Sequence, residues 1–319
     1  MDRFAVGLAI EWDGAFSDGI MRKIRIKHVD AFTTIPYTGN PAGVVTDADG
    51  LTEGQMQAIA REMNLSETAF ILPPSKSSAD LSIRWFTPYL EVPRCGHATI
   101  AGFHALAEEG KCGLTKDGVY HFQLESRSGI LPIEVQKNLG QVDVRFGLRV
   151  PTFRRASQYK LDLMRILNIQ SDEFDHHLSI VQTDYLFVPI RRLHTMFSMK
   201  PNFQAIANFM KMRNLGGICV FTTETIDRTS SVHSRFFAPA AGIDEDPVTG
   251  SSNGPLGVYL LEFGLIDPKD GACRIIAEQG DVIGRKGRVV VDLEVKEENV
   301  SAVKIGGQAV TVLQGELVV

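Results

Sequence analysis

The chain has 319 residues, of which 44% are hydrophobic and 22% are charged, a composition typical of a globular protein with room for two domains. Its formal net charge of −5 at pH 7 argues against a nucleic-acid partner, because no excess of Lys and Arg is available to neutralise phosphates. No segment approaches the roughly 20 apolar residues of a membrane-spanning helix, so no membrane partner is expected. Four cysteines lie far apart without a Cys-x-x-Cys pair, which predicts neither a metal site nor disulfides and favours a cytoplasmic location.

The first 20 residues carry a short apolar run followed by Glu11-Trp12-Asp13, a pattern unlike that of a secretory signal peptide. Alternation typical of a strand begins just after Met21. We therefore predict that residues 1–20 form an extension ahead of the first domain.

The first half predicts strands that surround one buried helix. Thr52 and Gln55 form a capping-box pattern, which predicts a helix ending near Met63. The segment from His97 to Glu109 is apolar on nearly every side, which is typical of a helix enclosed by other structure. Strands are predicted at 21–30, 42–45, 66–72, 81–86, 120–124, 131–136 and 141–150.

The second half predicts the same order of elements, with a second enclosed helix that starts at Ser251 and ends at Gly264. Two further helices are predicted at 161–167 and 201–213, and strands at 218–222, 232–237, 289–295 and 309–319. We assign residues 21–150 to a first α+β half, closed by strands from about 289–319, and residues 151–288 to a second half.

The two halves also repeat specific residues in the same order. The matches are Pro93 with Pro247, Gly96 with Gly250, Gly110 with Gly264, Asn64-Leu65 with Asn214-Leu215, and the segment 57–60 with 204–207. This order indicates an internal duplication with a period of about 150 residues, which is too long for a solenoid and fits two related domains.

Glu67 breaks the repeat, because its counterpart in the second copy is Gly217. It is either a structural residue that only one half retained or the acid/base group of an asymmetric site. His97 lies at a helix start, where the helix dipole disfavours its cationic form. We expect it to be a neutral donor or acceptor, either structural or functional.

Asp246 is either an N-terminal cap or a functional carboxylate, and its counterpart Val92 shows that the cap is not required by the fold. Cys95 and Thr249 occupy equivalent positions. Two facing thiols would suit a racemase with two bases, but a threonine hydroxyl is too weak a base. We therefore expect Cys95 to be structural.

No nucleotide-binding, P-loop or nucleophile-elbow motif is present in the sequence, so we expect no cofactor. Several motifs together resemble those of the phenazine-biosynthesis PhzF-like family, within the diaminopimelate epimerase-like superfamily of cofactor-independent isomerases. They are Gly39-Asn40-Pro41-Ala42, Ser66-Glu67-Thr68, Phe86-Thr87-Pro88, Glu91-Val92-Pro93, Cys95-Gly96-His97-Ala98-Thr99 and Glu245-Asp246-Pro247-Val248-Thr249-Gly250-Ser251.

This resemblance implies two pseudo-symmetric halves, each a barrel-like sheet around a central helix, with the site in the cleft between them. It implies Glu67 as the acid/base, with His97, Asp246 and Ser251 as supporting polar groups. It also implies a homodimer.

The expected reaction moves a proton on a small carboxylate-bearing substrate, either as an epimerisation or as a hydrogen shift. Helix N-termini at Gly96 and Gly250 are suited to hold the carboxylate and to stabilise enolate charge. The residues expected to bind substrate are Asn40, Ser66, Gly96, Thr249 and Gly250. The alternative is a binding or scaffold protein that shares the fold of an enzyme.

A carboxylate that takes and returns a proton must have a pKa near the working pH. We expect Glu67 to be enclosed and coupled to Asp246, so that one carboxyl stays protonated while the other is ionised.

Overall fold

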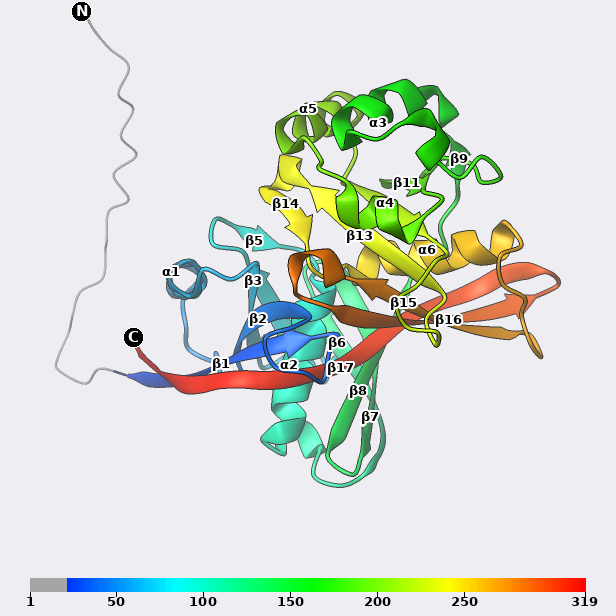
Figure 1. The fold of residues 1–319 in the computed structure, drawn as a ribbon. Helices are drawn as coiled ribbons and strands as arrows, with labels where there is room; N and C mark the ends of the chain where they lie inside the picture. Colours follow the sequence, from blue (N-terminus) through cyan, green and yellow to red (C-terminus); the bar gives the residue numbers. More distant parts are fainter. Residues whose placement is uncertain (1–21) are drawn as a thin grey trace, which may run out of the picture.

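The computed structural model describes residues 22–319 and shows a mixed α+β protein built in two halves (Figure 1). The predicted extension at residues 1–20 lies outside the described residues. Within residues 22–319, no helix combines the length and the apolar content that a membrane crossing needs.

The first half contains eight strands and two long helices among the described residues. Their bounds are β1 Lys23–Ala31, β2 Asn40–Val45, α1 Glu53–Met63, β3 Glu67–Leu72, β4 Leu81–Phe86, β5 Glu91–Val92, α2 Gly96–Glu108, β6 Gly118–Ser126, β7 Gly129–Asn138 and β8 Gln141–Leu148. The predicted capping box is present, because Thr52 accepts from the backbone N–H of Gln55 and the Gln55 side chain accepts from the N–H of Thr52.

The second half follows the same plan with additional short elements. Its bounds are β9 Arg154–Arg155, α3 Lys160–Leu167, β10 Val181–Gln182, β11 Tyr185–Pro189, α4 Leu193–Ser198, α5 Phe203–Arg213, β12 Gly217–Thr222, β13 Val232–Ala238, β14 Ile243–Asp246, α6 Gly250–Glu262, β15 Ala272–Gln279, β16 Gly287–Lys296 and β17 Asn299–Val318.

Strand pairing repeats from one half to the other. In the first half, β2 and β3 are parallel, β3 and β4 antiparallel, β4 and β6 parallel, and β6, β7 and β8 form an antiparallel run. In the second half, β11 and β12, β12 and β13, β13 and β15, and then β15, β16 and β17 repeat these pairings in the same order and direction. The predicted pseudo-symmetric α+β fold is therefore confirmed.

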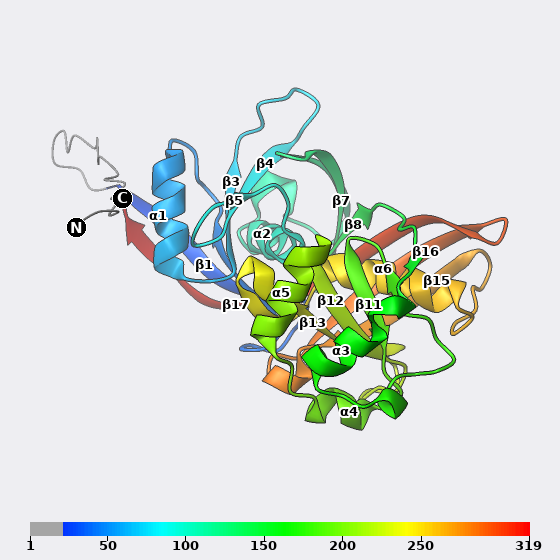
Figure 2. The ribbon, with the colours of Figure 1, turned by 90° about the horizontal axis from the view of Figure 1, so that it is seen from above.

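One helix in each half is enclosed by the strands. Every residue of α2 from His97 to Ala107 is buried, and Figure 2 looks nearly along this helix with strands of the first half around it. Most residues of α6 are buried as well. A Cβ atom on Gly254 of α6 would lie 2.5 Å from Leu148 Cδ1 and 3.0 Å from Ile305 Cγ2, so the missing side chain lets this helix pack close to the sheet.

Strand β17 connects the two halves and crosses the whole molecule in Figure 1. It pairs with β16 and β8 near its start and with β1 along residues 309–318. Strand β16, assigned to the first half by the sequence analysis, pairs with β15 as well as with β17. The boundaries near residues 150 and 288 stay a prediction.

Each half fixes one loop through a carboxylate at the same place in its sheet. Glu125 pairs with Ser82 across β6 and β4, and Glu278 pairs with His233 across β15 and β13. Glu125 accepts from the backbone N–H groups of residues 75 and 76, and Glu278 accepts from those of residues 226 and 227. The duplication thus extends to the polar contacts that hold the loops.

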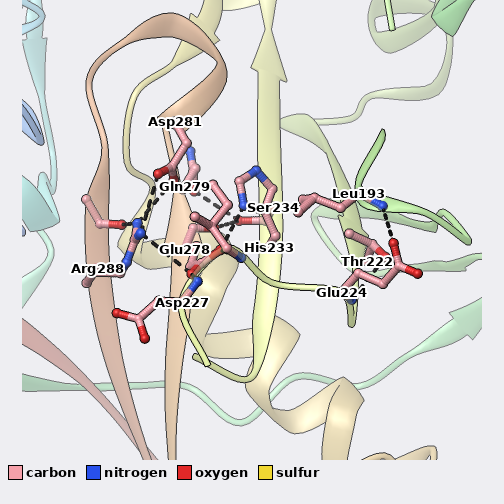
Figure 3. A network of polar contacts seen from close by, with 12 residues as sticks. Leu193, Thr222, Glu224, Asp227, His233, Ser234, Glu278, Gln279, Asp281 and Arg288 are labelled. Carbon is pink, nitrogen blue, oxygen red and sulfur yellow. Dashed lines mark hydrogen bonds and ion pairs between the residues drawn. The ribbon is translucent and has the colours of Figure 1, made fainter. Parts of the chain in front are cut away.

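In the second half this anchor is larger and buried (Figure 3). The side chains of His233 and Glu278 are fully buried, with His233 Nδ1 3.0 Å from Glu278 Oε2, and Arg288 Nη2 lies 3.5 Å from Glu278 Oε1. Burial by itself raises the pKa of Glu278, but the hydrogen bonds from His233 and the loop, together with the Arg288 charge, outweigh it and lower the pKa to about 2.

We expect Glu278→Gln to lower the free energy of unfolding by about 2–3 kcal/mol, because it removes a buried charge that several donors share. The matched control is Glu224→Gln, since Glu224 also accepts from a backbone N–H, that of Leu193, but its side chain is 39% exposed. Glu224→Gln is expected to lower the free energy of unfolding by less than about 1 kcal/mol.

Urea denaturation measures both values. The pKa of Glu278 is lower in the folded chain than in the unfolded chain, so its contribution is present above pH ~4.3 and is lost as the pH falls toward 2. Equal losses in the two variants at pH 7 would contradict this role.

Candidate active site

Residues from both halves line one cleft with a volume of about 660 Å³. The first half contributes the start of α2 and of β3, and the second half contributes the turn before α6. Seven of the predicted site residues line this cleft, namely Glu67, Gly96, His97, Asp246, Thr249, Gly250 and Ser251. Asn40 and Ser66 do not line the cleft, but Asn40 donates a hydrogen bond to Asp246, and the Ser66 hydroxyl contacts His97.

Glu67 begins β3 and points into this cleft, where its side chain is only 13% exposed. Its Oε2 atom lies 3.4 Å from His97 Nε2. Burial raises the pKa of Glu67 above its ordinary value, and the Ser66 hydroxyl and the Cys95 thiol oppose this only in part. The carboxyl group is therefore more basic than that of a glutamate in water.

His97, at the start of α2, has a close neighbour at each ring nitrogen. Its Nε2 atom lies 3.2 Å from Ser66 Oγ, and its Nδ1 atom lies 3.4 Å from Cys95 Sγ. Burial lowers the pKa of His97 to about 4, although the charge of Asp246 opposes this shift. The ring is thus neutral at pH 7, so one nitrogen donates and the other accepts.

Asp246 ends β14 and is held from two sides. Asn40 Nδ2 donates to its Oδ1 atom at 2.8 Å, and the Thr249 hydroxyl donates to its Oδ2 atom. Burial raises the pKa of Asp246 to about 6; the hydrogen bonds from Thr249 and Asn40 oppose the rise, whereas the charge of Glu67 adds to it. Asp246 consequently changes protonation state close to neutral pH.

Gln279, the last residue of β15, positions the turn that carries Asp246. It is 1% exposed, its Nε2 atom donates to the Asp246 carbonyl at 2.8 Å and to Thr249 Oγ1 at 3.0 Å, and its Oε1 atom accepts from the Thr249 N–H at 3.1 Å. Gln279 was not predicted from the sequence. A lone glutamine in a strand carries no signal, because glutamine is usually exposed.

The second half has no acid/base group at the place that corresponds to Glu67. A Cβ atom on Gly217 would lie 2.2 Å from Phe236 Cζ, so the phenylalanine ring fills the space that a side chain there would need. The same ring packs edge-on against Tyr185, with 5.1 Å between centroids. This aromatic pair, which the sequence analysis did not identify, forms the wall of the cleft on the second half.

Ser251 lies on the exposed side of the cleft. Its hydroxyl is 3.0 Å from the Tyr185 hydroxyl. Within the described part of the chain, no hydrogen bond joins Ser251 to Glu67, His97 or Asp246. Ser251 and the three buried groups therefore line the same cleft but occupy different parts of it.

Cys95 lies directly beside Glu67 and His97, and burial followed by the Glu67 charge raises the pKa of its thiol well above the ordinary value. The ligand atoms of these three residues lie within 4.8 Å of one another, the one such cluster found in residues 22–319. Sequence spacing did not predict the cluster, because β3 and α2 bring it together. Both nitrogens of His97 already have protein neighbours, so the arrangement fits a chain of polar contacts.

Comparisons with known proteins agree with this architecture. The family model described as phenazine biosynthesis-like protein matches residues 29–315. An uncharacterised isomerase of Clostridium acetobutylicum is 40% identical, covering 94% of this chain and 99% of its own. Trans-2,3-dihydro-3-hydroxyanthranilate isomerase of Pseudomonas fluorescens is 32% identical, covering 91% and 98%.

Among solved structures, a phenazine biosynthesis protein of the PhzF family from Bacillus anthracis is 35% identical with a TM-score of 0.84, covering 94% of this chain and all of its own. Relatives named isomerases thus span nearly the whole chain, which leaves the scaffold alternative without support. The chain therefore belongs to the phenazine biosynthesis-like family of isomerases.

Proposed function

We propose that this isomerase moves a proton on a small carboxylate-bearing substrate, with Glu67 as the group that takes and returns it. The observation that carries the proposal is the pair of half-buried carboxyl groups, Glu67 and Asp246, in one cleft with neutral His97. Carboxyl groups whose pKa values are raised toward neutral pH are suited to accept and then deliver protons.

In the first step the Glu67 carboxylate removes a proton from a carbon next to a carbonyl or conjugated group. The electron pair of the broken C–H bond moves into the conjugated system as an enolate. Backbone N–H groups at the starts of α2 and α6 are available to stabilise that charge and the substrate carboxylate. In the second step Glu67 returns the proton to another carbon, and the double bond shifts.

Asp246 and His97 have supporting roles in this proposal. Protonated Asp246 donates a hydrogen bond to the substrate, and neutral His97 keeps Glu67 oriented from 3.4 Å. The relative from Pseudomonas fluorescens is named for a cyclic amino acid, which makes trans-2,3-dihydro-3-hydroxyanthranilate a reasonable first compound for an assay.

We expect Glu67→Gln to slow exchange of substrate hydrogen with deuterated solvent by about 10²–10⁴-fold, because the amide cannot accept the proton. The exchange is followed by NMR with trans-2,3-dihydro-3-hydroxyanthranilate and a panel of cyclic and amino acids. The control is Glu62→Gln on the exposed side of α1. Exchange at the parent rate in Glu67→Gln would remove Glu67 from the mechanism.

Asp246→Asn tests the raised pKa without any substrate. A carboxyl whose pKa is higher in the folded chain than in the unfolded chain makes folding less favourable as the pH rises from ~4 to ~6. The free energy of unfolding of the variant, relative to that of the parent, should therefore rise by about 1–3 kcal/mol between pH 4 and pH 7.5. The hydrogen bonds from Asn40 and Thr249 favour the ionised carboxylate, so they reduce this pH-dependent gain without reversing it, because the net shift of the pKa is upward. If the difference in free energy of unfolding between variant and parent is the same at pH 4 and pH 7.5, the pKa of Asp246 is not raised.

We further propose a homodimer, as the family resemblance implies. Tyr89 and Leu90, neighbours in the turn between β4 and β5, are 85% and 56% exposed in the single chain and are candidates for burial between subunits. Light scattering is expected to give twice the 35.1 kDa of one chain. A mass near 35.1 kDa would exclude the dimer.

A further inference from the structure

Three exposed arginines line the cleft and have no partner among the described residues. Arg94 precedes α2, Arg149 follows β8, and Arg154 belongs to β9; all three are exposed and line the cleft. Their guanidinium groups make no hydrogen bond or ion pair with any residue from 22 to 319. Arg235 provides a contrast, because it binds Glu245 through two nitrogens at 2.9 and 2.7 Å.

The charges around these arginines do not neutralise them. Asp184 is the acidic residue at the opening, so three cations face one anion there. The other acids that line the cleft are Glu67 and Asp246, whose side chains are much less exposed than the three arginines. Such an excess of positive charge raises the local potential that an anionic ligand meets. The opening is therefore positive although the chain is acidic overall.

We propose that the substrate carries a second anionic group, a carboxylate or a phosphate, which Arg94, Arg149 and Arg154 bind at the opening of the cleft. Guanidinium groups match the planar or tetrahedral oxygens of both anions and bind them through paired hydrogen bonds. The inference rests on the proposed function, because it takes the cleft as the substrate site and the helix N-termini as the place of the first carboxylate.

The size of the cleft agrees with such a substrate. A volume of about 660 Å³ is within the usual range for small-molecule sites and exceeds what a ring with one carboxylate needs. The first carboxylate at the helix starts would leave the reacting carbon beside Glu67. The second group would then extend toward the exposed arginines, where it contributes to binding and orientation rather than to proton transfer.

The test compares benzoate, isophthalate and 3-phosphonobenzoate by titration calorimetry on the full chain. At low salt we expect both dianions to bind the parent enzyme about 10-fold or more tightly than benzoate, and this advantage should shrink as salt screens the arginines. At a pH where the phosphonate carries a single charge, tighter binding of the phosphonate than of isophthalate would favour a phosphate as the second group, and the reverse order a carboxylate. Failure of both dianions to bind better than benzoate would overturn the proposal.

The variant with Arg94→Gln, Arg149→Gln and Arg154→Gln should bind isophthalate no better than benzoate, while its benzoate affinity stays within about 2-fold of the parent. Unchanged benzoate binding also reports that the variant is folded. The matched control is Arg155→Gln, since Arg155 is an exposed neighbour of Arg154 on β9 that does not line the cleft. Arg155→Gln should bind isophthalate more tightly than benzoate by the same factor as the parent does.

A preference for isophthalate that survives in the triple variant, or an equal loss of benzoate binding, would place the second-anion site elsewhere and overturn the assignment. Glu67→Gln separates this result from the proposed reaction. That variant should lose hydrogen exchange and still prefer isophthalate, so either idea can fail while the other holds.

Discussion

The half-buried carboxyl groups of Glu67 and Asp246 set the main constraint on this structure. A carboxylate that loses water pays a desolvation cost, which appears here as a raised pKa for both groups. The protein offsets this cost for Asp246 with donors from Asn40 and Thr249, and Gln279 holds Thr249 in turn. The compensation is partial, and the remaining cost is what makes these groups suitable for proton transfer.

The duplicated fold explains why the cleft exists, but not how it is used. Two enclosed helices begin at equivalent positions, and their first residues line the same cleft from opposite halves. The repeat then diverges, because Glu67 corresponds to Gly217 and Phe236 fills the vacant space. A symmetric scaffold thereby carries an asymmetric site, with the acid/base groups on one side and an aromatic wall on the other.

Much of the fold could be predicted because its signals are local. The capping box at Thr52 and the enclosed helices follow from short patterns, and the repeated Asn64 and Asn214 both end helices in the left-handed conformation. The sequence analysis did not predict β15, whose Glu278 and Gln279 are polar yet buried. Their hydrogen bonds join residues far apart in the chain, so no local pattern predicts the strand.

The candidate site was likewise predictable from the sequence only in part. Motif residues such as Glu67, His97 and Asp246 were identified from the sequence, and the structure brings them to one cleft. The contact of His97 with Glu67, the support from Gln279 and the aromatic wall depend on how strands and helices meet, which spacing along the chain does not encode.

The central claim is that one carboxylate both removes and returns the proton, and internal return of hydrogen tests it most directly. A protiated substrate is converted in deuterated water, and the product is analysed at the earliest times for hydrogen carried over from the substrate. If Glu67 does both steps inside an enclosed cleft, part of the product retains the original hydrogen at its new position. Product that contains only solvent deuterium, even at the shortest times, would contradict direct return of the proton by an enclosed Glu67.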